Sequence, residues 1–133
     1  MIDQKTLSGK KVLIVEDDTF LHTLLADKLA RLREQGVEIF TALNAEEALK
    51  TARESTPDLM MLDVAMPGKN GFEVIEELRQ DERFKKTSII ILSNLSQESD
   101  KKRAQDLGVD SYLVKADFSL DEITNEITKL ILR

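Results

Sequence analysis

The sequence has no cysteine and only one histidine, His22. The lack of cysteine excludes disulfides, thiol catalysis and thiolate metal sites. One histidine rules out a histidine-rich metal site and argues against a Ser-His-Asp triad. No apolar run approaches the roughly 20 residues that span a bilayer, and the polar start, Met1 to Lys10, lacks the apolar stretch of a secretory signal. We therefore expect a cytoplasmic protein without membrane insertion.

Positive charge is also in short supply, with 19 Lys and Arg against 25 Asp and Glu and a net charge of −6. Nucleic-acid binding draws most of its affinity from basic side chains on phosphates, so a direct nucleic-acid partner is not expected. The length of 133 residues suits one compact domain. We expect a short polar lead over residues 1–10 and a single domain over residues 11–133.

Short apolar runs alternate with stretches of helical periodicity along the chain. The runs predicted as strands cover residues 12–15, 37–42, 59–62, 89–92 and 112–114, and a helical pattern follows each of them. Near-continuous apolar strands indicate a parallel sheet with helices on both faces. Right-handed crossovers leave few arrangements. We predict an α/β, flavodoxin-like doubly wound (βα)5 fold, with a five-stranded parallel sheet of order 2-1-3-4-5.

Acidic residues follow two of these strands. The order 2-1-3-4-5 places the topological switch point between the first and third strands, and sites lie at the carboxyl ends of the strands beside it. Glu16 and Asp17 end the first strand, and Asp63 ends the third. Three carboxylates in one crevice repel one another and raise at least one pKa unless a cation binds. Oxygen ligands without His or Cys favour Mg²⁺.

The fourth and fifth strands end in Ser93 and Lys115. A hydroxyl and a cation near an aspartate and a metal can surround the oxygens of a transferring phosphoryl group, a chemistry that depends on positioning and charge neutralisation. Asp63 would be the nucleophile, because carboxylates form aspartyl-phosphate intermediates.

Four motifs, in order and each at a predicted strand end, together resemble the response-regulator receiver family. They are Leu13-Ile14-Val15-Glu16-Asp17-Asp18, Leu62-Asp63-Val64-Ala65-Met66-Pro67 with Gly71, Ile91-Leu92-Ser93, and Tyr112-Leu113-Val114-Lys115. Each motif alone is weak, whereas the ordered set is specific. The resemblance runs from about Lys11 to the C-terminus.

The resemblance implies a signalling phosphoacceptor that acts chemically only on itself, not a metabolic enzyme. Asp63 corresponds to the phosphoacceptor. Asp17 corresponds to a direct Mg²⁺ ligand, Glu16 to one that acts through water, and the backbone carbonyl of Ala65 to a further ligand. The implied phosphodonor is a sensor histidine kinase or a histidine phosphotransfer protein.

The resemblance also implies a switch. Ser93 corresponds to the hydroxyl that moves toward the phosphoryl group, Lys115 to the lysine that pairs with it, and Tyr112 to the aromatic that turns inward. The switching surface would lie around residues 93–133 and contact an unknown downstream protein. Because no output domain follows the final helix, we expect the domain to act alone.

Three features depart from the family pattern. Ala116 stands where a proline, often after a cis bond, is usual, and a cis bond before alanine would cost about 2.5–4 kcal/mol. We therefore predict a trans Lys115–Ala116 bond and an altered loop over residues 116–118. Asn94 replaces a small residue and predicts slower phosphorylation by small donors. Apolar Ala65 and Leu95 predict a long-lived phosphoryl group.

Other interpretations remain beside this one. A phosphatase with an aspartyl-phosphate intermediate would need a second acid where Ala65 stands. An FMN-binding protein would need Ser, Thr or Gly residues that donate hydrogen bonds to the phosphate, where this chain has Glu16-Asp17-Asp18. A degenerate receiver that works by protein contact alone would not need the intact set of site residues. Simple structural roles are expected for several other residues: Asp18 and Thr19 (helix cap), His22 (surface or boundary), Met60 and Met61 (core), and Lys101 to Arg103 (solvated face or partner surface).

Overall fold

The structure, a computed structural model, describes residues 7–66, 68–94 and 98–133. Its sheet has five parallel strands in the order β2-β1-β3-β4-β5, so the predicted fold class is confirmed. The strands are β1 (Lys11–Val15), β2 (Glu38–Ala42), β3 (Leu59–Leu62), β4 (Ser88–Ser93) and β5 (Ser111–Val114). The α-helices are α1 (Thr19–Lys28), α2 (Ala30–Glu34), α3 (Ala45–Ser55), α4 (Gly71–Arg79), α5 (Glu98–Asp106) and α6 (Leu120–Leu132).

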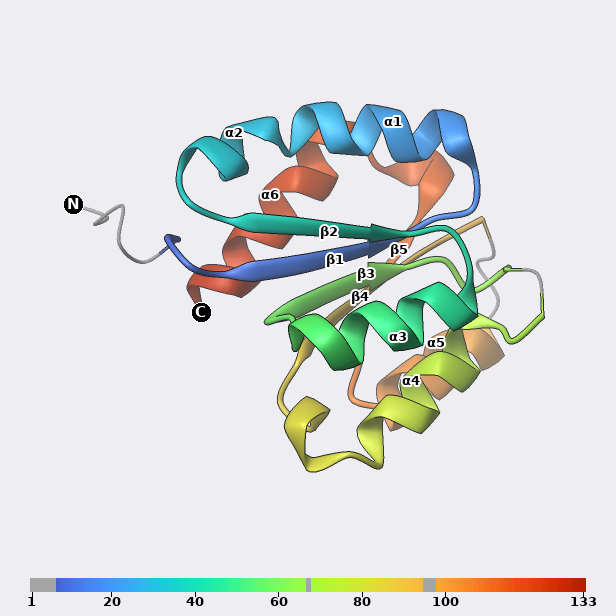
Figure 1. Ribbon diagram of the computed structural model, residues 1–133. Helices are drawn as coiled ribbons and strands as arrows, with labels where there is room; N and C mark the ends of the chain where they lie inside the picture. The colour runs from blue at the N-terminus through green and yellow to red at the C-terminus, as the bar shows by residue number, and fades with distance from the viewer. Residues whose placement is uncertain (1–6, 67, 95–97) are drawn as a thin grey trace.

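Helices cover both faces of the sheet, with α1, α2 and α6 on one face and α3, α4 and α5 on the other (Figure 1). Each face has its own apolar core, because neighbouring residues of a strand point to opposite sides. Met60 packs into one core and Met61 into the other, so the predicted packing role of this pair is confirmed. Among the described helices, none combines the length and the apolar character that crossing a membrane would require.

Side-chain caps fix the starts of the helices next to the site. Asp18 accepts hydrogen bonds from the N–H groups of Phe20 and Leu21, as predicted for a cap. Asn44 caps α3 by accepting from the N–H of Glu47. The spacing of Asn44 and Glu47 in the sequence predicts a capping box, which is only half correct, because the Glu47 carboxylate accepts from the N–H of Leu43 instead of Asn44. The side chain of Glu47 thus reaches one residue beyond the cap, to the backbone N–H of Leu43.

The first predicted helical stretch is interrupted. The leucine periodicity predicts continuous helix from Leu21 to Leu32, whereas α1 ends at Lys28 and α2 begins at Ala30. Leu29, fully buried between them, has φ −79° and ψ −4°, which loosens the turn without a proline or glycine. His22, on α1, is half-buried, which agrees with a boundary position.

Arg79 closes the opposite end of the sheet from the predicted site. Its guanidinium donates to five backbone carbonyls at 2.6–3.1 Å, which belong to Phe84, Lys85, Thr87, Leu107 and Gly108. These carbonyls join the 3-10 helix η2 (Glu82–Phe84) and the segment after α5 to the starts of β4 and β5. Burial lowers the pKa of Arg79, with nearby Asp110 opposing. No side-chain pattern in the sequence marks this cluster.

Candidate functional site

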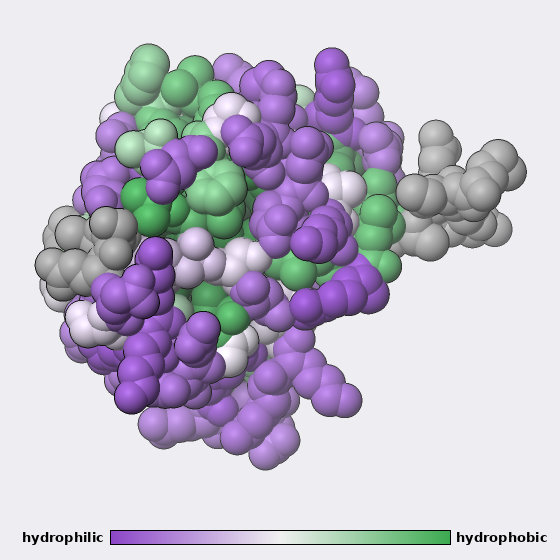
Figure 2. Space-filling model, turned by 180° about the vertical axis from the view of Figure 1, so that it is seen from behind, coloured by the Kyte–Doolittle hydropathy of each residue, from purple (hydrophilic) through white to green (hydrophobic). Residues whose placement is uncertain are grey.

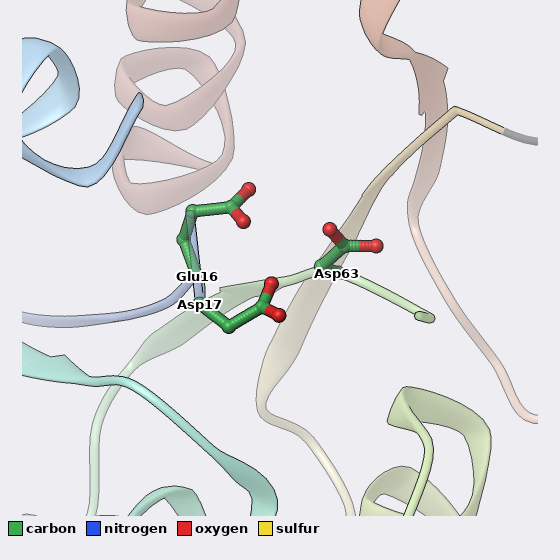
Figure 3. A group of neighbouring side chains, drawn as sticks. All are labelled: Glu16, Asp17 and Asp63. Carbon is green, nitrogen blue, oxygen red and sulfur yellow. The ribbon is translucent and has the colours of Figure 1, made fainter. Parts of the chain in front are cut away.

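Three carboxylates converge where β1 and β3 end. The two strands pair in parallel with Val15 opposite Leu62, so the residues that follow them meet at one edge of the sheet. One oxygen each from Glu16, Asp17 and Asp63 lies within 4.8 Å of the others (Figure 3). Glu16 and Asp63 are buried, and Asp17 is exposed. The structure thus brings together the three acids that the strand order predicts.

Lys115 reaches into this cluster from the end of β5. Its Nζ lies 2.8 Å from Oε1 of Glu16 and 2.8 Å from Oδ2 of Asp63, so one ammonium bridges two buried carboxylates. Burial alone would lower the pKa of Lys115, but hydrogen bonds to Asp63 and Glu16 outweigh it and raise the pKa. Desolvation raises the pKa of Glu16, although Lys115 and the N–H of Asp18 oppose the shift.

The backbone around Asp63 is held by the start of α4. Oδ1 of Asp63 accepts from the N–H of Ala65 at 2.9 Å, and the N–H of Gly71 donates to the carbonyl of Val64 at 2.9 Å. A Cβ on Gly71 would lie 2.5 Å from the Asp63 carbonyl oxygen and 3.0 Å from Cα of Val64. Only glycine therefore allows α4 to begin this close to Asp63, which gives a physical reason for Gly71 in the second motif.

Ser93 and Tyr112 form a second polar pair next to the acids. Ser93 ends β4 with no exposed surface, and Tyr112 on β5 is half-buried against the core beneath α3 and α4. A side-chain hydrogen bond joins them and opposes the rise that burial causes in the pKa of Tyr112. Asp63 also raises that pKa through its charge. Sequence reasoning named both residues but did not predict their bond.

The donor set fits a hard divalent cation. Three carboxylates against one ammonium leave excess negative charge, and all the side-chain donors are oxygens, which Mg²⁺ prefers. Both oxygens of Glu16 are already engaged, one by Lys115 and one by the N–H of Asp18. Exposed Asp17 has the carboxylate that meets solvent, so it is the acid best placed to meet an incoming ion directly.

The neighbouring departures from the family pattern take defined positions. The Lys115–Ala116 peptide bond is trans, as predicted. The segment after it forms a 3-10 turn, η3 (Lys115–Asp117). Asn94 is exposed beside buried Ser93, and Leu95 lies outside the described residues.

An apolar rim lies near the acidic crevice. The exposed large hydrophobic residues of the described chain are Phe20, Leu43 and Phe118, with 74%, 42% and 36% of their surface accessible. Phe20 belongs to the first turn of α1, and Figure 2 shows hydrophobic surface over that end of the molecule, at the upper left. Phe118 follows η3, directly after the segment that carries Lys115. Phe20 and Phe118 thus follow closely in the chain after Asp17 and Lys115, the site residues at the ends of β1 and β5.

Comparison with known proteins supports one family. Residues 12–128 match the family described as the response regulator receiver domain. The alkaline phosphatase synthesis transcriptional regulatory protein PhoP of Bacillus subtilis (strain 168) is 40% identical over 125 residues, which cover 94% of this chain and 49% of that protein. The phosphate regulon transcriptional regulatory protein PhoB of Rhizobium meliloti (strain 1021) is 34% identical, over 92% of this chain and 52% of that protein.

Solved structures give the same result. The response regulator TrrA of Thermotoga maritima, in complex with Mg²⁺ and beryllium fluoride, is 37% identical with a TM-score of 0.75, over 91% of this chain and 98% of that one. The chemotaxis response regulator CheY4 of Vibrio cholerae is 27% identical with a TM-score of 0.79, over 91% and 98%.

The chain belongs to the response regulator receiver domain family of two-component systems. Such domains are signalling phosphoacceptors and not classical enzymes, which agrees with the expectation from the motifs. The chain spans about half the length of the curated relatives it matches. The expectation that the domain acts alone receives no support from these relatives.

Proposed function

We propose that this receiver domain is a phosphorylation-controlled switch in which Asp63 accepts a phosphoryl group from a sensor histidine kinase or a histidine phosphotransfer protein. One observation carries the proposal: buried Asp63 lies within 4.8 Å of two further acids and 2.8 Å from the ammonium of Lys115. A purely structural buried carboxylate would pair with a cation, but it would not need two further acids beside it.

In this proposal an oxygen of Asp63 attacks the phosphorus of the phosphohistidine. A P–O bond forms as the P–N bond breaks, and the imidazole leaves. Lys115, which now bridges Asp63 and Glu16, neutralises the phosphoryl oxygens as they arrive. The groups that would hold Mg²⁺ are Asp17, Asp63 and the Ala65 carbonyl directly, and Glu16 through water. When bound, Mg²⁺ supplies charge neutralisation on the phosphoryl oxygens.

The switch begins at the Ser93–Tyr112 pair. A phosphoryl group on Asp63 offers the Ser93 hydroxyl a charged acceptor, and charge-assisted hydrogen bonds are stronger than neutral ones. Ser93 then gives up its present bond with Tyr112. Tyr112 repacks against the core and changes the surface formed by residues 93–133, to which an unidentified downstream protein binds.

The apolar rim suits contact with the phosphodonor. A histidine on a partner must come within bonding distance of Asp63, so the partner must cover the rim of the crevice. Phe20 and Phe118 offer exposed apolar area there, which becomes buried on docking. Replacing Phe20 with serine should slow transfer from a protein donor more than transfer from acetyl phosphate.

The lifetime of the phosphoryl group depends on the same surroundings. Ala65 is exposed beside Asp63 and offers no polar side chain to orient an attacking water. We therefore propose a long-lived phosphoryl group. We also propose that exposed Asn94 slows access of small donors, so that Asn94→Ala is phosphorylated faster by acetyl phosphate.

The decisive test is incubation with acetyl phosphate and Mg²⁺, followed by a gel that separates acyl-phosphorylated protein. Wild type and Asp27→Asn, which removes an exposed carboxylate on α1, should give a shifted band. Asp63→Asn should give none, and EDTA should abolish the wild-type band. An equal band in Asp63→Asn, or no band in wild type, would refute the proposal.

A further inference from the structure

Helix α5 is weakly embedded in the fold. Ala104 is the one residue between Glu98 and Asp106 that is buried. The basic run Lys101 to Arg103 was expected to be a solvated face or a partner surface. Lys101 agrees with a solvated face, since its side chain is 41% accessible and lies 4.0 Å from Glu98 on the same helix. Arg103 is also exposed, and its side chain contacts another helix as well.

Arg103 fastens α5 to α4 through two contacts. Its guanidinium carbon lies 4.7 Å from the centre of the Phe72 ring, and its Nη2 lies 2.7 Å from Oε1 of Glu76. Phe72 is 1% exposed, so the ring under the guanidinium is part of the core. A planar guanidinium can lie over an aromatic face and donate to a carboxylate at the same time.

Phe72 also directly follows Gly71, the residue at the start of α4 that lies against Asp63. Gly71, which precedes it, is packed against the backbone of Asp63 and Val64. Val64 and Met66, from the segment after Asp63, share a core cluster with Phe72. A line of packed groups therefore runs from Asp63 through Gly71 and Phe72 to Arg103, and Tyr112 packs against the same core cluster from β5.

We propose that Arg103, Phe72 and Glu76 form a latch that sets the position of α5 and that reports changes at Asp63 to this helix. The inference rests on the proposed function, because the signal is the occupation of the Asp63 site. When a phosphoryl group forms there, Val64 and Ala65 shift, because the Ala65 N–H now donates to Asp63. The start of α4 follows, and the Phe72 ring moves under Arg103. The latch acts beside the Ser93–Tyr112 pair as a second connection to the surface.

Two readouts separate the site from the latch. The sequence has one tyrosine and no tryptophan, so its intrinsic fluorescence reports Tyr112, next to the site. Hydrogen exchange of the α5 amides reports the latch. Both are measured with Mg²⁺ alone and with Mg²⁺ and beryllium fluoride, the combination bound in the TrrA structure.

The variants are Arg103→Gln, which removes both contacts, Arg103→Lys, which keeps a charge for Glu76, and Phe72→Leu, which keeps a buried apolar side chain. Lys102→Gln, at the exposed neighbouring position, is the control. With Mg²⁺ alone, α5 in Arg103→Gln should exchange about two- to fivefold faster than in wild type. Arg103→Lys should fall between the two, and Lys102→Gln should match wild type.

Adding beryllium fluoride should change α5 exchange in wild type and in Lys102→Gln. In Arg103→Gln and Phe72→Leu that change should fall by half or more, while the Tyr112 fluorescence response stays. An undiminished α5 response in Arg103→Gln would overturn the latch and leave the phosphoacceptor proposal intact. A wild type without any Tyr112 response would instead overturn the phosphoacceptor proposal, and the coupling with it.

Discussion

Two cations are withdrawn from solvent at opposite ends of the sheet, Lys115 where the strands end and Arg79 where β4 and β5 begin. Lys115 is neutralised by the carboxylates of Glu16 and Asp63, each at 2.8 Å, and both of these acids belong to the proposed phosphorylation site. Arg79 is surrounded by five backbone carbonyls, which carry no charge and cannot titrate. Both cations are thus partly removed from solvent, Lys115 beside partners that can change chemically and Arg79 beside partners that cannot.

The difference separates function from structure. A carboxylate partner can be phosphorylated or can bind a metal, so the contacts of Lys115 can be rearranged without unfolding the chain. The carbonyls around Arg79 belong to the backbone, and releasing them would open the loops that precede β4 and β5. We therefore expect substitutions of Lys115 to affect phosphorylation and substitutions of Arg79 to affect stability.

The largest expected effect is on activity at the Lys115 end. Lys115→Ala should slow phosphorylation by acetyl phosphate about 100-fold, because one preorganised cation at the reacting group is lost. Rates on an acyl-phosphate-sensitive gel would measure it. Lys129→Ala, an exposed lysine on α6, should keep the wild-type rate. A Lys115→Ala rate within about threefold of wild type would contradict the proposed catalytic role of this lysine.

The Arg79 end should show the reverse pattern. Arg79→Lys keeps the charge but loses the planar fork that reaches five carbonyls, and it should lower the free energy of unfolding by about 2–3 kcal/mol. Urea unfolding would measure the loss, with Arg33→Lys, exposed on α2, as the matched control. The Tyr112 response to beryllium fluoride should remain. Loss of that response in a folded Arg79→Lys protein would break the separation between the two ends.

The sequence predicted one end far better than the other. Strand order and site followed from βα alternation, because the residues after neighbouring parallel strands must meet at one edge. The sequence alone therefore predicts that Glu16, Asp63 and Lys115 lie together. The partners of Arg79 are carbonyls, which every residue has, so no side-chain pattern marks them. The break at Leu29 was missed for a similar reason, since no proline or glycine signals it.

At the Lys115 end of the sheet, Glu16 should make the stability of the fold depend on pH. Burial raises the folded-state pKa of Glu16 above its ordinary value of 4.5. Between 4.5 and that raised pKa the folded protein binds more protons than the unfolded chain, so stability falls as pH rises through this window. Below pH 4.5 the destabilisation from burying an ionised Glu16 is absent, and above the folded-state pKa it is fully present. The slope from one group is at most about 1.4 kcal/mol per pH unit.

Comparison with Glu16→Gln isolates this contribution. Urea unfolding of both proteins between pH 4.5 and 7, with a chelator present, should show wild type losing stability relative to the variant as the pH increases. Lys115 stays charged throughout, because its pKa is raised above 10.5. A constant difference between the two proteins across this range would show that burial of Glu16 is fully compensated by its partners.

The smallest expected effect is on stability, at Thr56, which follows α3 and precedes β3 at the end of the sheet where Arg79 lies. Its φ of 46° is in the left-handed region, which a β-branched residue adopts only at a cost. Thr56→Gly should raise the free energy of unfolding by about 0.5–1 kcal/mol, after the loss of the Thr56 Oγ1 bond to the Ser55 carbonyl and the greater freedom of unfolded glycine are included. Thr23→Gly, inside α1, should lower it instead. Because no site residue is involved, phosphorylation should stay unchanged in Thr56→Gly, and a change there would show that the two ends of the sheet are coupled.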